Sequence, residues 1–270
     1  MNLDELINII EGVLPIDSAL SGDKVGLQIE AENNINKALI CLEITDEVVS
    51  EAVDKECDLI LAFHPLIFNP LIEIRQNERV GRLTSSLIKA GISVYIVHTT
   101  FDVYENGTSD IIANKIGLVD KQFLIPDENY ENKGMGVIGV FNGSKDELLE
   151  KCSQIFNSPL KFNQSGSGNF KKIAIVGGSG GSFLSKVMKT DADVFITADI
   201  SYHTFHRVEG HLTIIDPGHY EMEQFVPEGL KRLLEDKLTV ELELSSSLTN
   251  PVRFYPDLNF TSKQKKYLNY

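Results

Sequence analysis

The sequence alternates short apolar segments with amphipathic ones, and this alternation restricts the fold more than any other feature. Segment 58–63 (DLILAF) is continuously apolar and has the length of a strand. Segment 79–91 repeats apolar residues at helical spacing and ends at Gly91, a common helix stop. Short apolar strands between amphipathic helices are typical of βαβ units and a largely parallel sheet. In the first half we expect strands at 38–44, 58–63 and 92–97 and helices at 46–56, 79–91 and 109–117.

A polar stretch at residues 126–134 interrupts the alternation, which then restarts. Ser144 and Glu147 form a capping box that opens a helix through Phe156. Segment 238–244 alternates with period two, which is typical of a strand with one solvated face. The second half should contain strands at 134–141, 171–176, 193–199, 211–216 and 238–244, helices at 144–156, 182–190 and one ending at Leu234, and a loop at 163–170.

These elements predict an α/β fold of two interlinked lobes with mostly parallel sheets. We expect a first lobe at residues 1–125 and a second at 126–240 that carries the last polar motif. A C-terminal strand and tail at 241–270 should pack back on the first lobe. The two lobes have related layouts, but the sequence shows no internal repeat.

Composition excludes several functional classes. The chain has 270 residues, 42% of them apolar, which supports a full core and argues against disorder. A net charge of −14 repels phosphate backbones, so general nucleic-acid binding is not expected. No apolar run approaches the ~20 residues that span a bilayer, so we expect no membrane partner. Asp4 and Glu5 replace the basic residues of a secretory signal, and three cysteines lack CxxC spacing, which favours a cytoplasmic protein with buried, reduced thiols.

Polar, metal-competent side chains follow several predicted strands. In parallel α/β sheets, functional groups gather beyond the carboxyl ends of the strands. Five of the six histidines lie within ten residues after such an end. Neutral imidazoles and carboxylates on neighbouring strand ends are suitable ligands for a divalent cation. The candidates are His64, His98, Asp102, Asp199, His203, His206, Asp216, His219 and Glu223.

Each candidate also has a structural interpretation. His219 and Glu223 stand four residues apart and could form an ordinary helix side-chain pair. Asp102 and Asp216 could stabilise turns. The glycine-rich segment 177–182 could cradle an anion, but it lacks the Lys-Ser/Thr of a P-loop and equally fits a tight strand-to-helix turn. No GxSxG motif is present, and no cysteine adjoins a histidine, so covalent hydrolase chemistry has little support.

Four motifs, in order, resemble those of a known family. They are GDKVGLQI (22–29), FHPLIFNPL (63–71), 97–118 with its HTTFD, and 197–225 with its DPGHYEMEQF. Together they are similar to the type 2 GTP cyclohydrolase I homologues, also called the NIF-three-like dinuclear-metal family, in its short form. The resemblance implies a two-lobed α/β subunit that assembles into a toroidal homohexamer, with metal sites in clefts that face the interior of the ring.

The resemblance also implies a ligand set. The family motif reads His-His-Pro-Leu, and later ligands lie in His-Thr-x-x-Asp and Gly-His-Tyr-x-x-Glu motifs. Here these positions hold Phe63, His64, Asp102, His219 and Glu223. In the family arrangement, His64 and Asp102 would hold one ion and His219 the other, with Glu223 bridging both. Phe63 removes one ligand, which predicts one firm and one weakened metal position.

Two histidines are alternatives for replacing the lost ligand. His98 or His203 could compensate, although each equally fits the role of orienting a ligand carboxylate. Lys24 stands where the family usually has Asn, which decides nothing by itself.

Two functions follow from these residues. The first is a metal-dependent hydrolase acting on a small molecule such as a nucleotide, with Zn, Mn, Fe or Mg as cofactor. His203 or His206 would then transfer protons. The second is a non-enzymatic, metal-containing oligomeric module for interaction or regulation, which the loss of a ligand at Phe63 favours.

Overall fold

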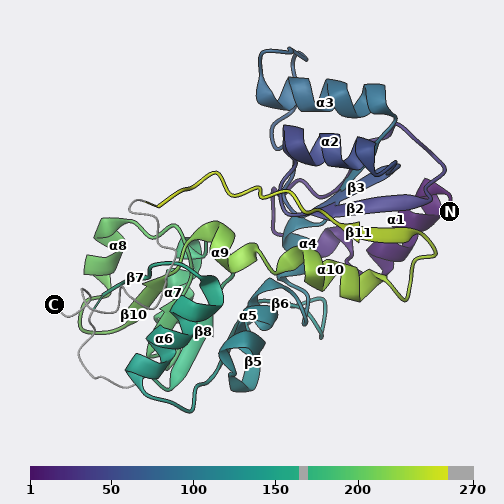
Figure 1. Cartoon of the computed structure of the whole chain (residues 1–270). Helices are drawn as coiled ribbons and strands as arrows, with labels where there is room; N and C mark the ends of the chain where they lie inside the picture. Colours follow the sequence, from purple (N-terminus) through teal and green to yellow (C-terminus); the bar gives the residue numbers. More distant parts are fainter. Residues whose placement is uncertain (164–169, 255–270) are drawn as a thin grey trace.

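The computed structural model describes residues 1–163 and 170–254 and contains two β-sheets (Figure 1). The first sheet has the strand order β1-β4-β3-β2-β11. Three neighbouring pairs are parallel, namely β4–β3, β3–β2 and β2–β11, whereas β1 pairs antiparallel with β4. These strands are β1 (Gly26–Ile29), β2 (Lys37–Cys41), β3 (Leu59–Ala62), β4 (Ser93–Ile96) and β11 (Glu241–Leu244).

Helices cover both faces of the first sheet (Figure 1). α2 (Asp46–Asp54) and α3 (Arg79–Ala90) pack on one face with Leu39 and Ile60, whereas α1 (Leu3–Val13) and α10 (Val226–Leu234) pack on the other. Burial on both faces explains why the central strands are apolar throughout.

The second sheet has the strand order β5-β6-β8-β9-β10-β7. Its central strands β8, β9 and β10 are parallel, and the remaining pairs are antiparallel. The strands are β5 (Val119–Pro126), β6 (Gly134–Val140), β7 (Lys161–Phe162), β8 (Lys172–Ile175), β9 (Val194–Ile196) and β10 (Thr213–Asp216). The predicted α/β class with parallel central strands is confirmed.

Helices also flank the second sheet. α5 (Thr108–Ile116) and α6 (Lys145–Phe156) bury their apolar residues against one face, and α6 begins with the predicted capping box. α7 (Leu184–Val187), preceded by the short η2 (Gly181–Phe183), packs on the other face, where α8 (Tyr202–Arg207) also lies. The predicted helix at 182–190 is therefore shorter and less regular than expected.

Short elements complete the junction between the sheets. α4 (His98–Asp102) follows β4, and α9 (His219–Glu223) follows β10, whereas η1 (Ile16–Ser18) lies after α1. None of the helices in residues 1–163 and 170–254 has the length and apolar character needed to cross a membrane. Cys41, Cys57 and Cys152 are buried free thiols, as predicted.

The chain crosses from one sheet to the other at positions outside the polar stretch 126–134. α5 already packs in the core of the second sheet, and the stretch 126–134 joins β5 to β6 within that sheet. α10 returns to the core of the first sheet, and β11 pairs with β2. The division at residues 125 and 240 stays a prediction. Residues 164–169 of the expected loop and 255–270 of the tail lie outside the described residues.

Candidate metal centre

The site lies where the carboxyl ends of parallel strands from both sheets face each other. His64 follows β3, and its backbone N–H donates to the carbonyl of Leu42, 2.9 Å away. His219 and Glu223 begin and end α9, which follows β10. The strand ends of one sheet thus supply one imidazole, and those of the other supply an imidazole and a carboxylate.

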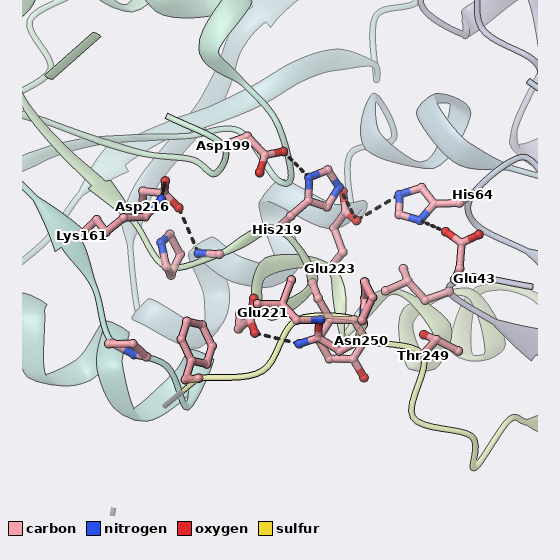
Figure 2. Close-up of a pocket in the computed structure, with 18 of the residues that line it drawn as sticks. Glu43, His64, Lys161, Asp199, Asp216, His219, Glu221, Glu223, Thr249 and Asn250 are labelled. Carbon is pink, nitrogen blue, oxygen red and sulfur yellow. Dashed lines mark hydrogen bonds and ion pairs between the residues drawn. The ribbon is translucent and has the colours of Figure 1, made fainter. Parts of the chain in front are cut away.

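Three side chains converge on a common point (Figure 2). The Nε2 atoms of His64 and His219 lie 3.1 and 3.0 Å from Oε2 of Glu223. That buried oxygen has no partner of hydrogen-bonding geometry among the described residues, although both nitrogens are within ion-pair distance. An ion with bonds of about 2.1 Å holds its ligand atoms roughly 3.0–3.4 Å apart. The three atoms therefore fit a divalent cation.

Two further carboxylates orient the imidazoles (Figure 2). Nδ1 of His64 lies 3.2 Å from Oε2 of Glu43, and Nδ1 of His219 lies 2.7 Å from Oδ2 of Asp199. With Nδ1–H donated to a carboxylate, each Nε2 can offer its lone pair to a metal. Arg79 in turn donates to the other oxygen of Glu43 at 2.7 Å.

The electrostatics of the group favour positive charge. Burial disfavours the charged form of His64, but Glu223 and Glu43 outweigh it and raise the pKa of His64 to about 10. The close contact with the Glu223 carboxylate raises the pKa of His219 to about 9, with burial opposing and Asp199 adding to the rise. Burial alone would raise the pKa of Glu223, yet the two imidazoles lower it to about 2. The carboxylates that stabilise two positively charged imidazoles here would also attract a metal cation.

Asp102 borders this group without converging on the same point. It lies at the end of α4, is buried, and accepts a hydrogen bond of 2.6 Å from the hydroxyl of Thr108. Burial and the negative charge of Glu223 raise the pKa of Asp102 to about 7. The structure therefore brings together His64, His219 and Glu223 and places Asp102 beside them.

His203 and His206 lie on α8, where both side chains are exposed. Their rings flank that of Tyr202, at centroid distances of 5.5 and 4.7 Å. Nδ1 of His206 lies 3.8 Å from a carboxylate oxygen of Glu209. In the described chain, neither histidine joins the converging group or lines the adjacent cleft.

A cleft of about 720 Å³ opens from the converging group. Glu43, His64 and Arg79 line it from the first half of the chain, and residues after β10 line it from the second. Lys161 extends along its other side, where the ammonium lies 2.6 Å from Oδ2 of the buried Asp216. Much of the remaining wall is apolar, formed by Leu42, Pro159, Leu160, Pro217, Tyr220, Pro251, Val252 and Phe254.

Comparison with known proteins places this architecture in a family. The family model Duf34/NIF3 (NGG1p interacting factor 3) matches residues 1–251. This chain belongs to the Duf34/NIF3 family. A Lactococcus lactis relative named GTP cyclohydrolase 1 type 2 homolog is 34% identical over 93% of this chain and 98% of its own length.

Solved structures show the same NIF3 fold. A Bacillus cereus protein described as related to NIF3 superposes with a TM-score of 0.86 at 24% identity, covering 94% of this chain and 99% of the other. A hypothetical protein of Staphylococcus aureus gives a TM-score of 0.85 at 26% identity, with the same coverage. The predicted family and its two-sheet fold are confirmed.

Phe63 occupies a core position beside the site of this NIF3 chain. Its side chain is fully buried, and its ring lies 5.0 Å from that of His64 and 5.4 Å from that of His98. Nδ1 of His98 is 2.7 Å from Oδ1 of Asp23, so this histidine is linked to the motif at 22–29. The apolar ring of Phe63, packed against the imidazole of His98, therefore fills the position where the resemblance to the family motif predicts a histidine.

The glycine-rich segment has a steric role at the site. Gly178 has φ +63°, and a Cβ placed there would lie 2.1 Å from Oε1 of Glu223. The amides of Gly177 and Gly180 already donate to the hydroxyls of Ser109 and Thr197. The segment thus lets backbone approach Glu223 closely, which supports the tight-turn interpretation.

Sequence reasoning missed the partners of the two histidines. Glu43 lies inside the predicted strand 38–44, and Asp199 is one of the metal-ligand candidates at a strand end, but which imidazole each contacts depends on how the loops pack. The sequence signal for Glu43 is its position just after the apolar residues of β2, the strand that runs parallel to β3 before His64.

Proposed function

We propose that this NIF3 protein is a metal-dependent hydrolase with one principal ion position, formed by His64, His219 and Glu223. The observation that carries the proposal is the buried Glu223 oxygen that faces two imidazole nitrogens at 3.0 and 3.1 Å without hydrogen-bonding geometry. Asp102 is the proposed fourth ligand, since it adjoins the group and its carboxyl would ionise beside a cation. The donor set suits Zn, Mn or Fe better than Mg, because Mg prefers oxygen ligands.

The residues around the ion position would orient its ligands and form an apolar cleft beside it. Glu43 and Asp199 hold the Nδ1 protons and thereby fix which nitrogen of each imidazole faces the ion. A divalent ion held there would act as a Lewis acid and lower the pKa of water toward ~7. The largely apolar cleft would exclude bulk water from the substrate, and its volume suits a nucleotide-sized molecule.

Metal content tests the ion position. We expect about one equivalent of metal per chain by elemental analysis, and loss of that metal in His64→Ala and Glu223→Ala. Glu43→Gln and Asp199→Asn keep the shape of the orienting side chains but remove their charge, so they should weaken metal affinity about tenfold or more. Two equivalents in the wild type, or full metal content in Glu223→Ala, would contradict a single position.

Turnover tests the hydrolase. A panel of nucleotides, including guanine nucleotides, and phosphoesters should be hydrolysed only with added Mn, Fe, Zn or Mg, and not by the His64→Ala, Glu223→Ala double variant. His203→Ala and His206→Ala test proton transfer separately, because both variants should retain the metal. Equal turnover by the metal-free double variant would refute the proposal.

Phe63 favours a second candidate function, a metal-containing module that does not catalyse a reaction. Mechanisms that use two ions need ligands for both, and the buried phenyl ring supplies none. Stoichiometric metal together with no turnover for any substrate and metal would support this alternative. The homohexamer and the cytoplasmic location stay predictions, and the mass of the protein in solution tests the former.

A further inference from the structure

The segment after β11, residues 245–254, crosses from the first sheet to the cleft (Figure 1). Glu51 on α2 anchors its start. The carboxylate accepts hydrogen bonds from the hydroxyls of Ser245, Ser246 and Ser247, at 2.6, 2.8 and 2.8 Å. Backbone N–H groups of Ser246 and Ser247 donate to the same carboxylate, so the segment leaves the sheet in a defined direction.

A second anchor lies at the cleft itself. The amide of Asn250 donates to Oε1 of Glu221, 2.9 Å away, and Glu221 belongs to the same short helix as His219 and Glu223 (Figure 2). The part of the segment from residue 249 to 254, except Arg253, lines the cleft. This segment therefore connects a helix of the first sheet to the helix that carries two of the converging side chains.

The wall formed by this segment is apolar and partly uncovered. Val252 and Phe254 line the cleft while 54% and 41% of their surfaces remain exposed. Pro159, Leu160 and Lys161 line the same cleft. The family model matches residues 1–251, so its match ends within this segment.

We propose that residues 249–254 are the specificity-determining wall of the cleft, and that they select a small ligand with a flat apolar body and an anionic group. The apolar body would cover Val252 and Phe254, and the anion would pair with Lys161, whose ammonium has donors beyond the one directed at Asp216. This inference names the substrate class of the proposed hydrolase. It rests on the proposed function only in one respect, which is that the bound ligand is called a substrate.

Binding of anilinonaphthalene sulfonate, an aromatic anion that fluoresces in apolar surroundings, tests the wall on the full chain. We expect about one dye per chain. Val252→Ser and Phe254→Ser should each raise its dissociation constant about tenfold, since each removes apolar contact area. Lys161→Gln should weaken binding and reduce its salt dependence, whereas Lys161→Arg should restore both. Phe68→Ser removes another exposed phenyl ring, which lies outside the cleft, and should leave dye binding unchanged.

Unchanged dye affinity in both Val252→Ser and Phe254→Ser would overturn the proposal, as would an equal loss in Phe68→Ser. Metal content of the same variants separates this result from the proposed function. Retained metal with weakened dye binding supports the wall. A wild-type chain that binds the dye at the wall but contains no metal would refute the ion position and leave the wall standing.

Discussion

At the scale of single residues, the candidate centre depends on how closely ordinary side chains approach one another, and not on rare residue types. His64, His219 and Glu223 are common residue types, and their combination becomes informative because one buried oxygen faces two nitrogens. Gly178 makes this arrangement sterically feasible, since any side chain there would overlap Glu223.

Gly178→Ala should therefore disturb the site more than the fold. The substitution places Cβ on Oε1 of Glu223 and forces an alanine to adopt φ +63°, which costs about 1–2 kcal/mol of stability. We expect a matching fall in the free energy of unfolding by chemical denaturation, and a larger relative loss of metal affinity by calorimetry. Gly181→Ala is the matched control, because its Cβ would meet only Ile200 at an ordinary 3.6 Å. Equal metal affinity in both variants would show that Glu223 tolerates displacement.

At the scale of elements, local pattern predicted the central strands, the longer helices and the α6 cap, whereas it missed β1, β5 and β7. Sheet membership does not follow from local pattern, because periodicity sets which face of a strand is buried but not which strand lies beside it. β1 and β11 illustrate this limit, since β1 pairs with β4 and β11 pairs with β2, and neither partner is its neighbour in the sequence. α4 is only five residues long and lacks a side-chain cap, so no sequence signal announces it.

The sequence pattern predicts which residues gather at the site, but it does not predict which of them contact one another. His64, His219 and Glu223 could be expected to gather, because the carboxyl ends of parallel strands lie along one edge of each sheet. Glu43 contacts His64 across the ends of the neighbouring strands β2 and β3, and Asp199 contacts His219 across those of β9 and β10. These pairings depend on strand order and on the conformation of the loops after each strand. Such contacts depend on tertiary geometry that a single sequence does not encode locally.

The attachment of β11 and the following segment to α2 gives a prediction at this scale. Partial burial opposes ionisation of Glu51, but its hydrogen bonds from Ser245 and Ser246 hold its pKa well below the usual range. Glu51→Gln should lower the free energy of unfolding at pH 7 by about 1–3 kcal/mol. Asp54→Asn, on the same helix and exposed, should have little effect.

The dependence on pH follows from the sign of that shift. A depressed folded pKa stabilises the protein at pH values above the unfolded value of about 4.3 and loses this effect as pH falls through the folded value. The stability difference between wild type and Glu51→Gln should therefore be constant near neutrality and shrink below about pH 4. Thermal unfolding across this range checks it, and a difference that grew on acidification would contradict the assignment.

At the scale of the whole molecule, the candidate centre joins parts of the chain that belong to different sheets. His64 follows a strand of the first sheet, and His219 and Glu223 follow a strand of the second. A bound ion would thus link the two halves, and its binding free energy would add to the stability of the folded chain.

Removal of metal should consequently lower the unfolding temperature. At free metal 100 times the dissociation constant, the stabilisation is about 2.7 kcal/mol. Differential scanning calorimetry with metal and with chelator should show this shift in the wild type and not in His64→Ala, where the link from the first sheet is absent. A shift of equal size in His64→Ala would place the bound metal elsewhere.

The return of β11 to the first sheet also bears on the order of events during synthesis. Within the described residues β11 is the last strand to be synthesised, and the imidazole and carboxylate of α9 come shortly before it in the chain. A growing polypeptide on the ribosome therefore exposes His64 long before its counterparts exist. Capture of an ion at this position would therefore have to wait until the segment that carries His219 and Glu223 has been synthesised and has left the ribosome.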